Sequence, residues 1–190
     1  MKKKIKNLIS FIIIFFPYFS FSNNIENQIQ PEIQSQDLNI KNKFLATKKN
    51  LVVTANDYAT QSGHQLLNLG GNVVDSAVAI QLTLGLVEPQ SSGLGGGIFI
   101  TYYDYNSKQT YFYDGREKAP MNIKKDIFLN KDKNPKKFYD AAIGGKSVGV
   151  PGTLDALYKI HNEYGNLKWA EVIEPVLKLS KEGFYPSPRL

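Results

Sequence analysis

The sequence predicts an α+β protein in which helices are layered on a sheet that contains antiparallel strands. Two observations support this fold class. Helical and strand-like apolar patterns alternate from residue 50 to the end of the chain, and the clearest strand pair is antiparallel. That pair lies in residues 97–117, where two β-branched and aromatic runs flank YNSKQ, a stretch with turn chemistry. A simple parallel doubly wound sheet is therefore not expected.

Residues 1–22 have the pattern of a secretory signal peptide. A basic start, MKKKIKN, precedes the apolar stretch LISFIIIFFPYFSFS, and the small residues Ser20 and Ser22 fit a cut after Ser22. The apolar stretch is short and contains Pro17, which argues against an uncleaved membrane anchor. We therefore expect a periplasmic or secreted protein, with no stable membrane span once the leader is removed.

The chain that follows the leader is nearly neutral. The whole sequence has a formal net charge of +6, and without the four lysines of the leader this falls to +2. Residues 23–45 are rich in Asn and Gln and are predicted to be a flexible tether, whereas residues 46–190 form the predicted folded part. Residues 131–137, KDKNPKK, are a local basic cluster that favours a solvated loop. With no basic stripe elsewhere, the sequence argues against a nucleic-acid partner.

Cysteine and histidine usage narrows the chemistry. The chain has no cysteine, which excludes disulfides, thiolate catalysis and cysteine-bound zinc. Its two histidines, His64 and His161, do not have the spacing of paired metal ligands. Both are interpreted as ordinary surface or core residues, and a metal site is not expected.

The first predicted elements are a strand at residues 50–56 and two helices. The first helix has one face of small and apolar residues: Ala59, Gly63, Leu66, Leu67 and Gly70. Gly70 and Gly71 supply its C-terminal stop. Asn72 is the predicted N-cap of the second helix, and Asp75 favours its dipole. The segment VVDSAVAIQLTLGLVEP is apolar on nearly every side, which predicts a buried helix that ends at Pro89.

Two more helices follow the hairpin. Residues 147–165 predict a strand, a Pro-Gly break and a helix that Gly165 terminates. The predicted apolar face of that helix consists of Leu154, Leu157, Tyr158 and His161. The last helix has the apolar stripe Trp169, Val172, Ile173, Val176 and Leu177, and Gly183 stops it. Pro175 is expected to kink this helix or to mark its first turn.

The glycine-rich stretch SSGLGGG, residues 91–97, allows three interpretations: a phosphate cradle, an oxyanion loop or close backbone packing. A dinucleotide fingerprint would need glycine at position 98, which is Ile98, and it would precede a helix rather than a strand. No Lys-Ser/Thr pair follows, which excludes a P-loop. An oxyanion loop of the hydrolase type lacks its G-x-S-x-G nucleophile elbow. Close backbone packing is therefore favoured.

The stretch DGREKAP, residues 114–120, carries the candidate ligand-binding residue. Arg116 follows the second hairpin strand and has carboxylates at Asp114 and Glu117 to hold it. A guanidinium in such a position can bind a ligand carboxylate with two parallel hydrogen bonds. An exposed ion pair, which contributes roughly 0–1 kcal/mol, is the alternative that the residues alone favour.

Several ordered blocks together resemble the γ-glutamyltranspeptidase (glutathione hydrolase) family. They are GGNVVDSAVAIQLTLGLVEPQSSGLGGGIF, DGREKAP, VGVPGTLDAL and GFYPSPRL, and the resemblance runs from about Val53 to Leu190. It implies the αββα sandwich of the N-terminal nucleophile hydrolases, of which this chain would be an incomplete N-terminal portion. It also implies an acyl-threonine mechanism on γ-glutamyl substrates such as glutathione, with no cofactor and no metal. By resemblance, Arg116 binds the substrate's α-carboxylate.

The resemblance stops short of the catalytic residue. None of the seven threonines has the family's nucleophile context, so no catalytic residue is assigned in this chain. We expect a truncated large-subunit portion that is inactive alone, with a small-subunit chain as the partner that carries the nucleophile. Two alternatives stay open: one chain of a split enzyme, and a secreted module that binds glutamate or γ-glutamyl compounds without catalysis. Hydrolysis and transfer are not distinguished.

Overall fold

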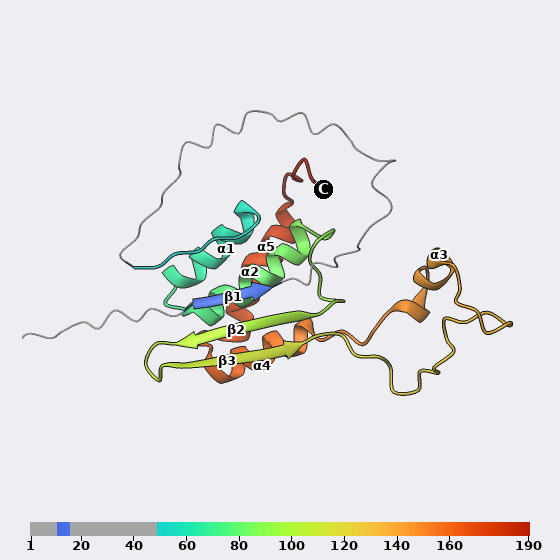
Figure 1. The fold of residues 1–190 in the computed structure, drawn as a ribbon. Coiled ribbons are helices and arrows are strands. Elements are labelled where there is room, and N and C mark those ends of the chain that lie inside the picture. Colours follow the sequence, from blue (N-terminus) through green and yellow to red (C-terminus); the bar gives the residue numbers. More distant parts are fainter. Residues whose placement is uncertain (1–10, 16–48) are drawn as a thin grey trace, which may run out of the picture.

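The computed structural model describes residues 11–15 and 49–190 (Figure 1). The elements, in chain order, are β1 (Phe11–Phe15), α1 (Asp57–Asn68), α2 (Val73–Val87), β2 (Ile98–Asp104), β3 (Gln109–Gly115), α3 (Phe138–Ala142), the 3-10 turn η1 (Gly145–Ser147), α4 (Thr153–Tyr164) and α5 (Trp169–Glu182). The described part is therefore a mixture of helices and one antiparallel sheet, as the sequence predicts.

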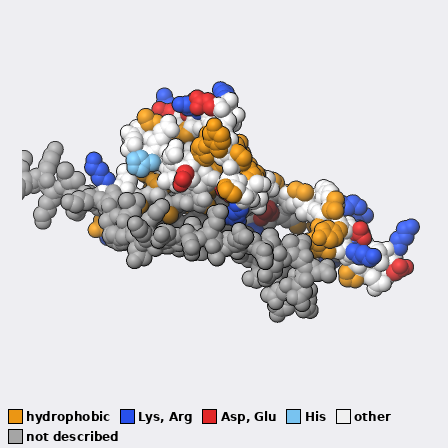
Figure 2. Space-filling model, turned by 90° about the horizontal axis from the view of Figure 1, so that it is seen from above, with side chains coloured by type: hydrophobic (Ala, Val, Ile, Leu, Met, Phe, Trp, Pro, Cys, Tyr) orange, Lys and Arg blue, Asp and Glu red, His pale blue; other side chains and the backbone are white. Residues whose placement is uncertain are grey.

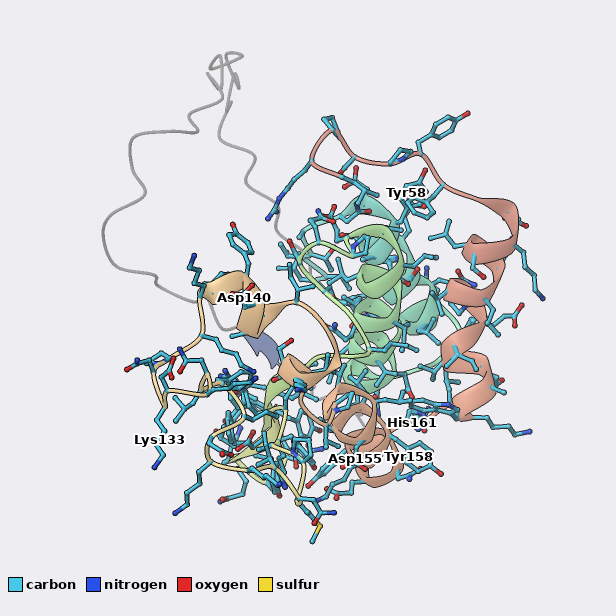
Figure 3. All side chains as sticks on the ribbon, turned by 90° about the vertical axis from the view of Figure 1, so that its right-hand side faces the viewer. Tyr58, Lys133, Asp140, Asp155, Tyr158 and His161 are labelled. Carbon is cyan, nitrogen blue, oxygen red and sulfur yellow. The ribbon has the colours of Figure 1, made fainter. Side chains whose placement is uncertain are left out.

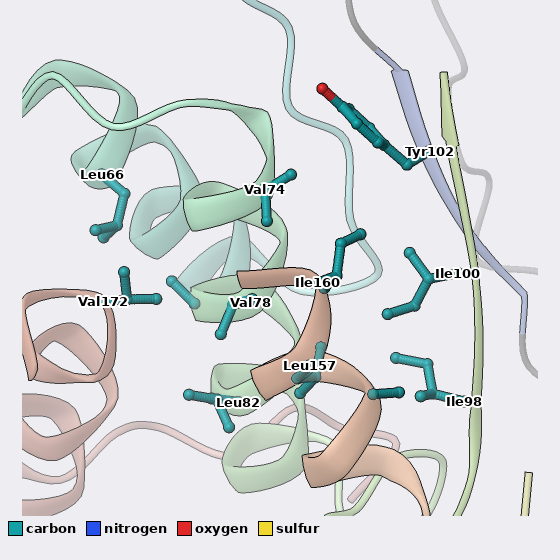
Figure 4. Packing of buried hydrophobic residues seen from close by; sticks show 12 residues of the cluster. Leu66, Val74, Val78, Leu82, Ile98, Ile100, Tyr102, Leu157, Ile160 and Val172 are labelled. Carbon is teal, nitrogen blue, oxygen red and sulfur yellow. The ribbon is translucent and has the colours of Figure 1, made fainter. Parts of the chain in front are cut away.

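The elements form layers. The sheet has the strand order β1-β2-β3, and α4 packs against β3. Helix α2 is central, since it contacts α1, α4 and α5 (Figure 1). The buried side chains between these layers make one core, and Figure 4 shows side chains of β2 facing those of α2 and α4. Its fully buried members include Leu66, Val74, Val78, Ile98, Ile100, Leu157, Ile160 and Val172.

The predicted hairpin is confirmed. Strands β2 and β3 pair in register from Ile98–Gly115 to Asp104–Gln109. The Asp104 carboxylate closes the turn, because it accepts hydrogen bonds from the Ser107 hydroxyl (2.7 Å), the Asn106 amide (3.0 Å) and the Ser107 amide (3.3 Å). These bonds, led by the one from the hydroxyl, hold the pKa of Asp104 below its usual value.

Tyrosine side chains of β2 and β3 connect the hairpin to α4. The Tyr113 hydroxyl donates a hydrogen bond to the Glu163 carboxylate, and burial followed by this bond raises the pKa of Tyr113. Tyr164 packs against the rings of Tyr102 and Tyr111, with centroid distances of 4.8 and 5.3 Å. These contacts join α4 to both strands of the hairpin.

The leader and the tether fall mostly outside the described residues. Residues 1–10 and 16–48 are not described, so the tether at 23–45 and nearly all of the leader at 1–22 stay predictions. The exception is β1, which pairs antiparallel with β2 from Phe11–Tyr103 to Phe15–Phe99. Among the helices that the structure describes, none has the length and apolar character needed to cross a membrane.

Helix α2 begins at the predicted N-cap Asn72, which in the structure forms a capping box with Asp75. The Asn72 side chain accepts hydrogen bonds from the amides of Val74 (2.8 Å) and Asp75 (3.1 Å). In return, the Asp75 carboxylate accepts from the Asn72 amide at 2.7 Å. Three amide groups at the start of the helix, those of Asn72, Val74 and Asp75, are satisfied in this way.

The Asp75 carboxylate also clamps the turn between α4 and α5. It is fully buried and accepts hydrogen bonds from the amides of Asn166 (3.1 Å) and Leu167 (3.3 Å). Nε2 of His161 lies 3.4 Å away, and the His161 ring packs edge-on against Trp169. His161 is thus a core histidine and His64 an exposed one, in agreement with the interpretation of both as ordinary residues.

Two strand predictions are wrong. Residues 50–56 form no strand, because no described strand lies beside them to complete a ladder, and Leu51 and Val53 remain exposed. The predicted strand before the Pro-Gly break is reduced to a bridge between Lys118 and Val150. An alternating apolar pattern marks a segment that can pair, but pairing itself needs a neighbour.

Details of the last two helices also differ from the predictions. On α4, Leu154 and Tyr158 are about half exposed, whereas Ala156 and Ile160 are buried, so the buried face is rotated from the predicted one. Pro175 lies inside α5 rather than in its first turn, and it is buried against the core. Gly183 stops α5 as predicted, with a φ of 82°.

Between β3 and α4 the chain leaves the layers as an arm, residues 119–149 (Figure 1). Figure 3 shows Lys133 and Asp140 on the arm, apart from Asp155, Tyr158 and His161 on α4. Figure 2 shows basic and hydrophobic side chains together along the arm. The basic cluster 131–137 belongs to it and is almost entirely exposed, which confirms the predicted solvated loop.

Candidate functional site

Arg116 lies directly after β3, at the base of the arm. Its side chain is 45% exposed, and its Nε forms an ion pair with Oε2 of Glu117 at 3.4 Å. Within the described part of the chain, the two terminal guanidinium nitrogens have no hydrogen-bond partner. Those nitrogens are the ones that a carboxylate ligand would use in a two-pronged contact.

The sequence predicts that both Asp114 and Glu117 hold the Arg116 guanidinium, and the structure confirms this for Glu117 only. Glu117 holds the guanidinium, as expected from the sequence. Asp114 does not, because its Oδ1 accepts a hydrogen bond from the Arg116 backbone amide at 3.0 Å instead. The Asp-Gly pair before Arg116 carries a turn signal that could have revealed this side-chain-to-backbone bond.

Gly115 is where β3 meets α4. A β-carbon at this position would lie 2.6 Å from Cβ of Ala156 and 2.9 Å from Cγ2 of Ile98. A β-carbon on Gly152, just before α4, would overlap the carbonyl oxygen of Gly115. The start of α4 can therefore reach the end of β3 only because both positions are glycines.

The glycine-rich stretch, which immediately precedes β2, packs against Glu117, the residue after Arg116. A β-carbon on Gly97 would lie 2.5 Å from Oε2 of Glu117 and 2.9 Å from the Glu117 backbone nitrogen. The Gly96 carbonyl oxygen accepts hydrogen bonds from the amides of Gly152 (3.1 Å) and Thr153 (3.3 Å). Close backbone packing is thus confirmed for Gly97. It does not explain Gly93 and Gly95, since neither has an atom within 4 Å of the β-carbon position.

Three separated motifs consequently converge on one place. The glycine stretch, the segment around Arg116 and the start of α4 share the contacts just described. On the far side of Arg116, Lys118 and Val150 exchange two backbone hydrogen bonds, at 2.8 and 3.2 Å. The backbone of Arg116 is held from both directions while its side chain reaches solvent. Arg116 thus combines a restrained backbone with a partly exposed guanidinium.

The described surface also has a hollow that is separate from the Arg116 cluster. A hollow of about 470 Å³ lies along α1 and is lined by Thr60, Gln61, His64, Gln65, Asn68 and Leu69. It contains one titratable side chain and is not part of the Arg116 cluster. In residues 11–15 and 49–190, no group of three or more His, Cys, Asp or Glu side chains could hold a metal ion.

Known proteins match most of the chain. A family model described as Gamma-glutamyltranspeptidase matches residues 59–190. The glutathione hydrolase proenzyme of Bacillus subtilis is 39% identical over 137 residues, which cover 72% of this chain and 23% of the relative. Glutathione hydrolase 3 of Arabidopsis thaliana is 34% identical over 200 residues, which cover 100% of this chain and 30% of the relative. The chain spans less than a third of the length of these curated relatives.

Solved structures match the fold. The gamma-glutamyltranspeptidase of Pseudomonas nitroreducens complexed with L-DON has a TM-score of 0.70 and 32% identity, covering 76% of this chain and 42% of that one. That of Helicobacter pylori has a TM-score of 0.70 and 33% identity, covering 74% and 40%. These neighbours are N-terminal nucleophile hydrolases, so the predicted fold class is confirmed over the matched part.

Proposed function

Because this chain belongs to the gamma-glutamyltranspeptidase family, we propose that it supplies the glutamyl-binding part of an enzyme that cleaves γ-glutamyl amides such as glutathione. The substrate's α-carboxylate binds the guanidinium of Arg116. The nucleophile is a threonine outside these 190 residues, supplied as a small-subunit portion. The leader directs the protein to a periplasmic or secreted location.

One observation carries the binding role. Arg116 combines a backbone held on both sides with terminal guanidinium nitrogens that have no described partner. A positioned guanidinium loses little freedom when it binds a carboxylate, so more of the interaction energy appears as affinity.

The chemistry then follows from the position of the glutamyl head. With the α-carboxylate held, the γ-carbonyl is presented to the threonine hydroxyl at a fixed distance. The threonine oxygen bonds to the carbonyl carbon, the amide C–N bond breaks, and the amine leaves with a proton. Water or an amino group then attacks the resulting ester and releases the threonine.

Binding can be tested on the full chain by NMR. The chain has two arginines, Arg116 and Arg189, so its arginine Nε–H region contains two signals. L-glutamine is a γ-amide with a free α-carboxylate, and L-isoglutamine has the two groups exchanged. We expect L-glutamine to shift the Arg116 signal at millimolar concentrations, and L-isoglutamine to shift it far less. Arg189 serves as the internal reference.

The variant Arg116→Lys should weaken L-glutamine binding at least about 10-fold, because lysine keeps the charge but loses the two-pronged geometry. The matched control is Arg189→Lys, at the other arginine, whose Nη2 donates a hydrogen bond to the Ser91 hydroxyl at 3.2 Å. Equal affinity in Arg116→Lys and the unmodified chain would refute the binding role. Release of p-nitroaniline from a γ-glutamyl anilide tests the second half of the proposal, since the chain alone should release none above background.

A further inference from the structure

The backbone in front of Arg116 has an intrinsic weakness. Gly115 must be a glycine because α4 leaves no space for a β-carbon. Glycine, however, has more backbone freedom than any other residue. The ladder with Ile98 holds Gly115 itself, but β3 ends there, so the backbone of Arg116, one residue beyond the strand, needs a restraint of its own.

Asp114 supplies that restraint. Its Oδ1 accepts a hydrogen bond from the Arg116 amide at 3.0 Å, which closes a small ring across Gly115. Aspartate and asparagine form this ring because their carbonyl oxygen sits three bonds from the α-carbon, whereas glutamate places it one carbon farther away. Asp114 is exposed, so the bond is not a by-product of burial.

Asp114 does not hold the guanidinium by charge, because its oxygen bonds the Arg116 backbone amide instead. A negative side chain two residues from Arg116 repels an anionic ligand. The contribution of Asp114 is therefore the position of its acceptor oxygen, which bonds the Arg116 amide. We propose that Asp114 is a positioning residue that fixes the backbone of Arg116, and thereby aims the guanidinium, through its acceptor oxygen and not through its charge. This rests on the binding role proposed for Arg116.

Three substitutions separate geometry from charge. Asp114→Asn removes the charge but keeps the acceptor oxygen in place. Asp114→Glu keeps the charge but moves the oxygen out of reach. Asp114→Ala removes both. If geometry decides, asparagine behaves like the native residue, and glutamate behaves like alanine.

The first measurement does not depend on any ligand. Backbone amide exchange of Arg116 and ¹⁵N relaxation of its Nε are recorded on the full chain, with Arg189 as the reference. We expect the Arg116 amide to exchange about 10-fold faster in Asp114→Ala and Asp114→Glu, with a more mobile Nε, and to stay within about 2-fold in Asp114→Asn. If Asp114→Asn matches Asp114→Ala, or if all three match the native chain, the proposal is wrong.

The second measurement is the L-glutamine titration of the same variants. Affinity should fall about 3- to 10-fold in Asp114→Ala and Asp114→Glu and should be kept or improved in Asp114→Asn. Equal loss in all three variants would overturn the proposal even if the exchange data agreed. If L-glutamine fails to shift Arg116 in the native chain, the binding role falls, while the exchange and relaxation data still decide whether Asp114 fixes Arg116.

Discussion

The carboxylate of Glu117 lies so close to the α-carbon of Gly97 that a β-carbon there would come within 2.5 Å of Oε2. The same oxygen is the ion-pair partner of Arg116 at 3.4 Å. Gly97 therefore controls where Glu117 can lie, and Glu117 in turn holds Arg116. The glycine stretch acts on Arg116 through this one side chain.

Replacing Gly97 by alanine should disturb both stability and the site. The added methyl group would meet the Glu117 backbone nitrogen at 2.9 Å as well as its carboxylate, so a side-chain rotation alone cannot relieve the contact. We expect a loss of about 1–3 kcal/mol in the free energy of unfolding, measured with urea, and a more mobile Arg116 Nε. Gly95→Ala is the matched control, because no atom lies within 4 Å of its β-carbon position. Equal effects of the two substitutions would contradict this account.

Asp75→Asn should be far more destabilising than its small change in shape suggests. The amide group would turn one acceptor oxygen into a donor that faces backbone amides of Asn72 or Asn166. Because the site is fully buried, we expect a loss of about 3–5 kcal/mol in urea unfolding. The control Asp155→Asn, at an exposed position in the first turn of α4, should cost about 0.5 kcal/mol or less. A small loss in Asp75→Asn would mean that the clamp is not important.

The hairpin turn gives a prediction about pH. The pKa of Asp104 is lowered below its usual value of 3.8, chiefly by the Ser107 hydroxyl. Its contribution to stability is thus present above pH 3.8 and is lost as the pH falls through the lowered pKa. Ser107→Ala should move the ¹³C titration midpoint of the Asp104 carboxyl upward, toward 3.8. Ser147→Ala, at a serine of the arm, should leave that midpoint where it is, and an unmoved midpoint in Ser107→Ala would refute the assignment.

Local signals made much of the fold predictable from the sequence. The Asn72 cap, the hairpin turn and the Gly183 stop each depend on residues within a few positions of one another. The predicted strand at 50–56 failed for the opposite reason, since pairing depends on a distant partner. The sequence predicted the place of Asp75 at the start of α2. It did not predict the bond to Asn166, which is 91 residues away along the chain.

The site was predictable in part for the same reason. Arg116 could be selected from its own motif, but its contact with the glycine stretch could not be read from either motif alone. The hairpin register offers a route to it, since one step beyond the Ile98–Gly115 pair places Gly97 opposite Arg116. The approach of α4 to Gly115 has no such local signal, and it needed the tertiary structure.

The bridge between Lys118 and Val150 closes the base of the arm. Both ends of the arm are fastened at one point by two hydrogen bonds, so its length and sequence can change without a change in the distance between those ends. Doubling such a loop costs only about 0.6 kcal/mol in closure entropy. The arm is therefore a natural attachment point: a fluorophore, an affinity tag or a grafted segment at its tip would leave the orientation of Arg116 unaltered.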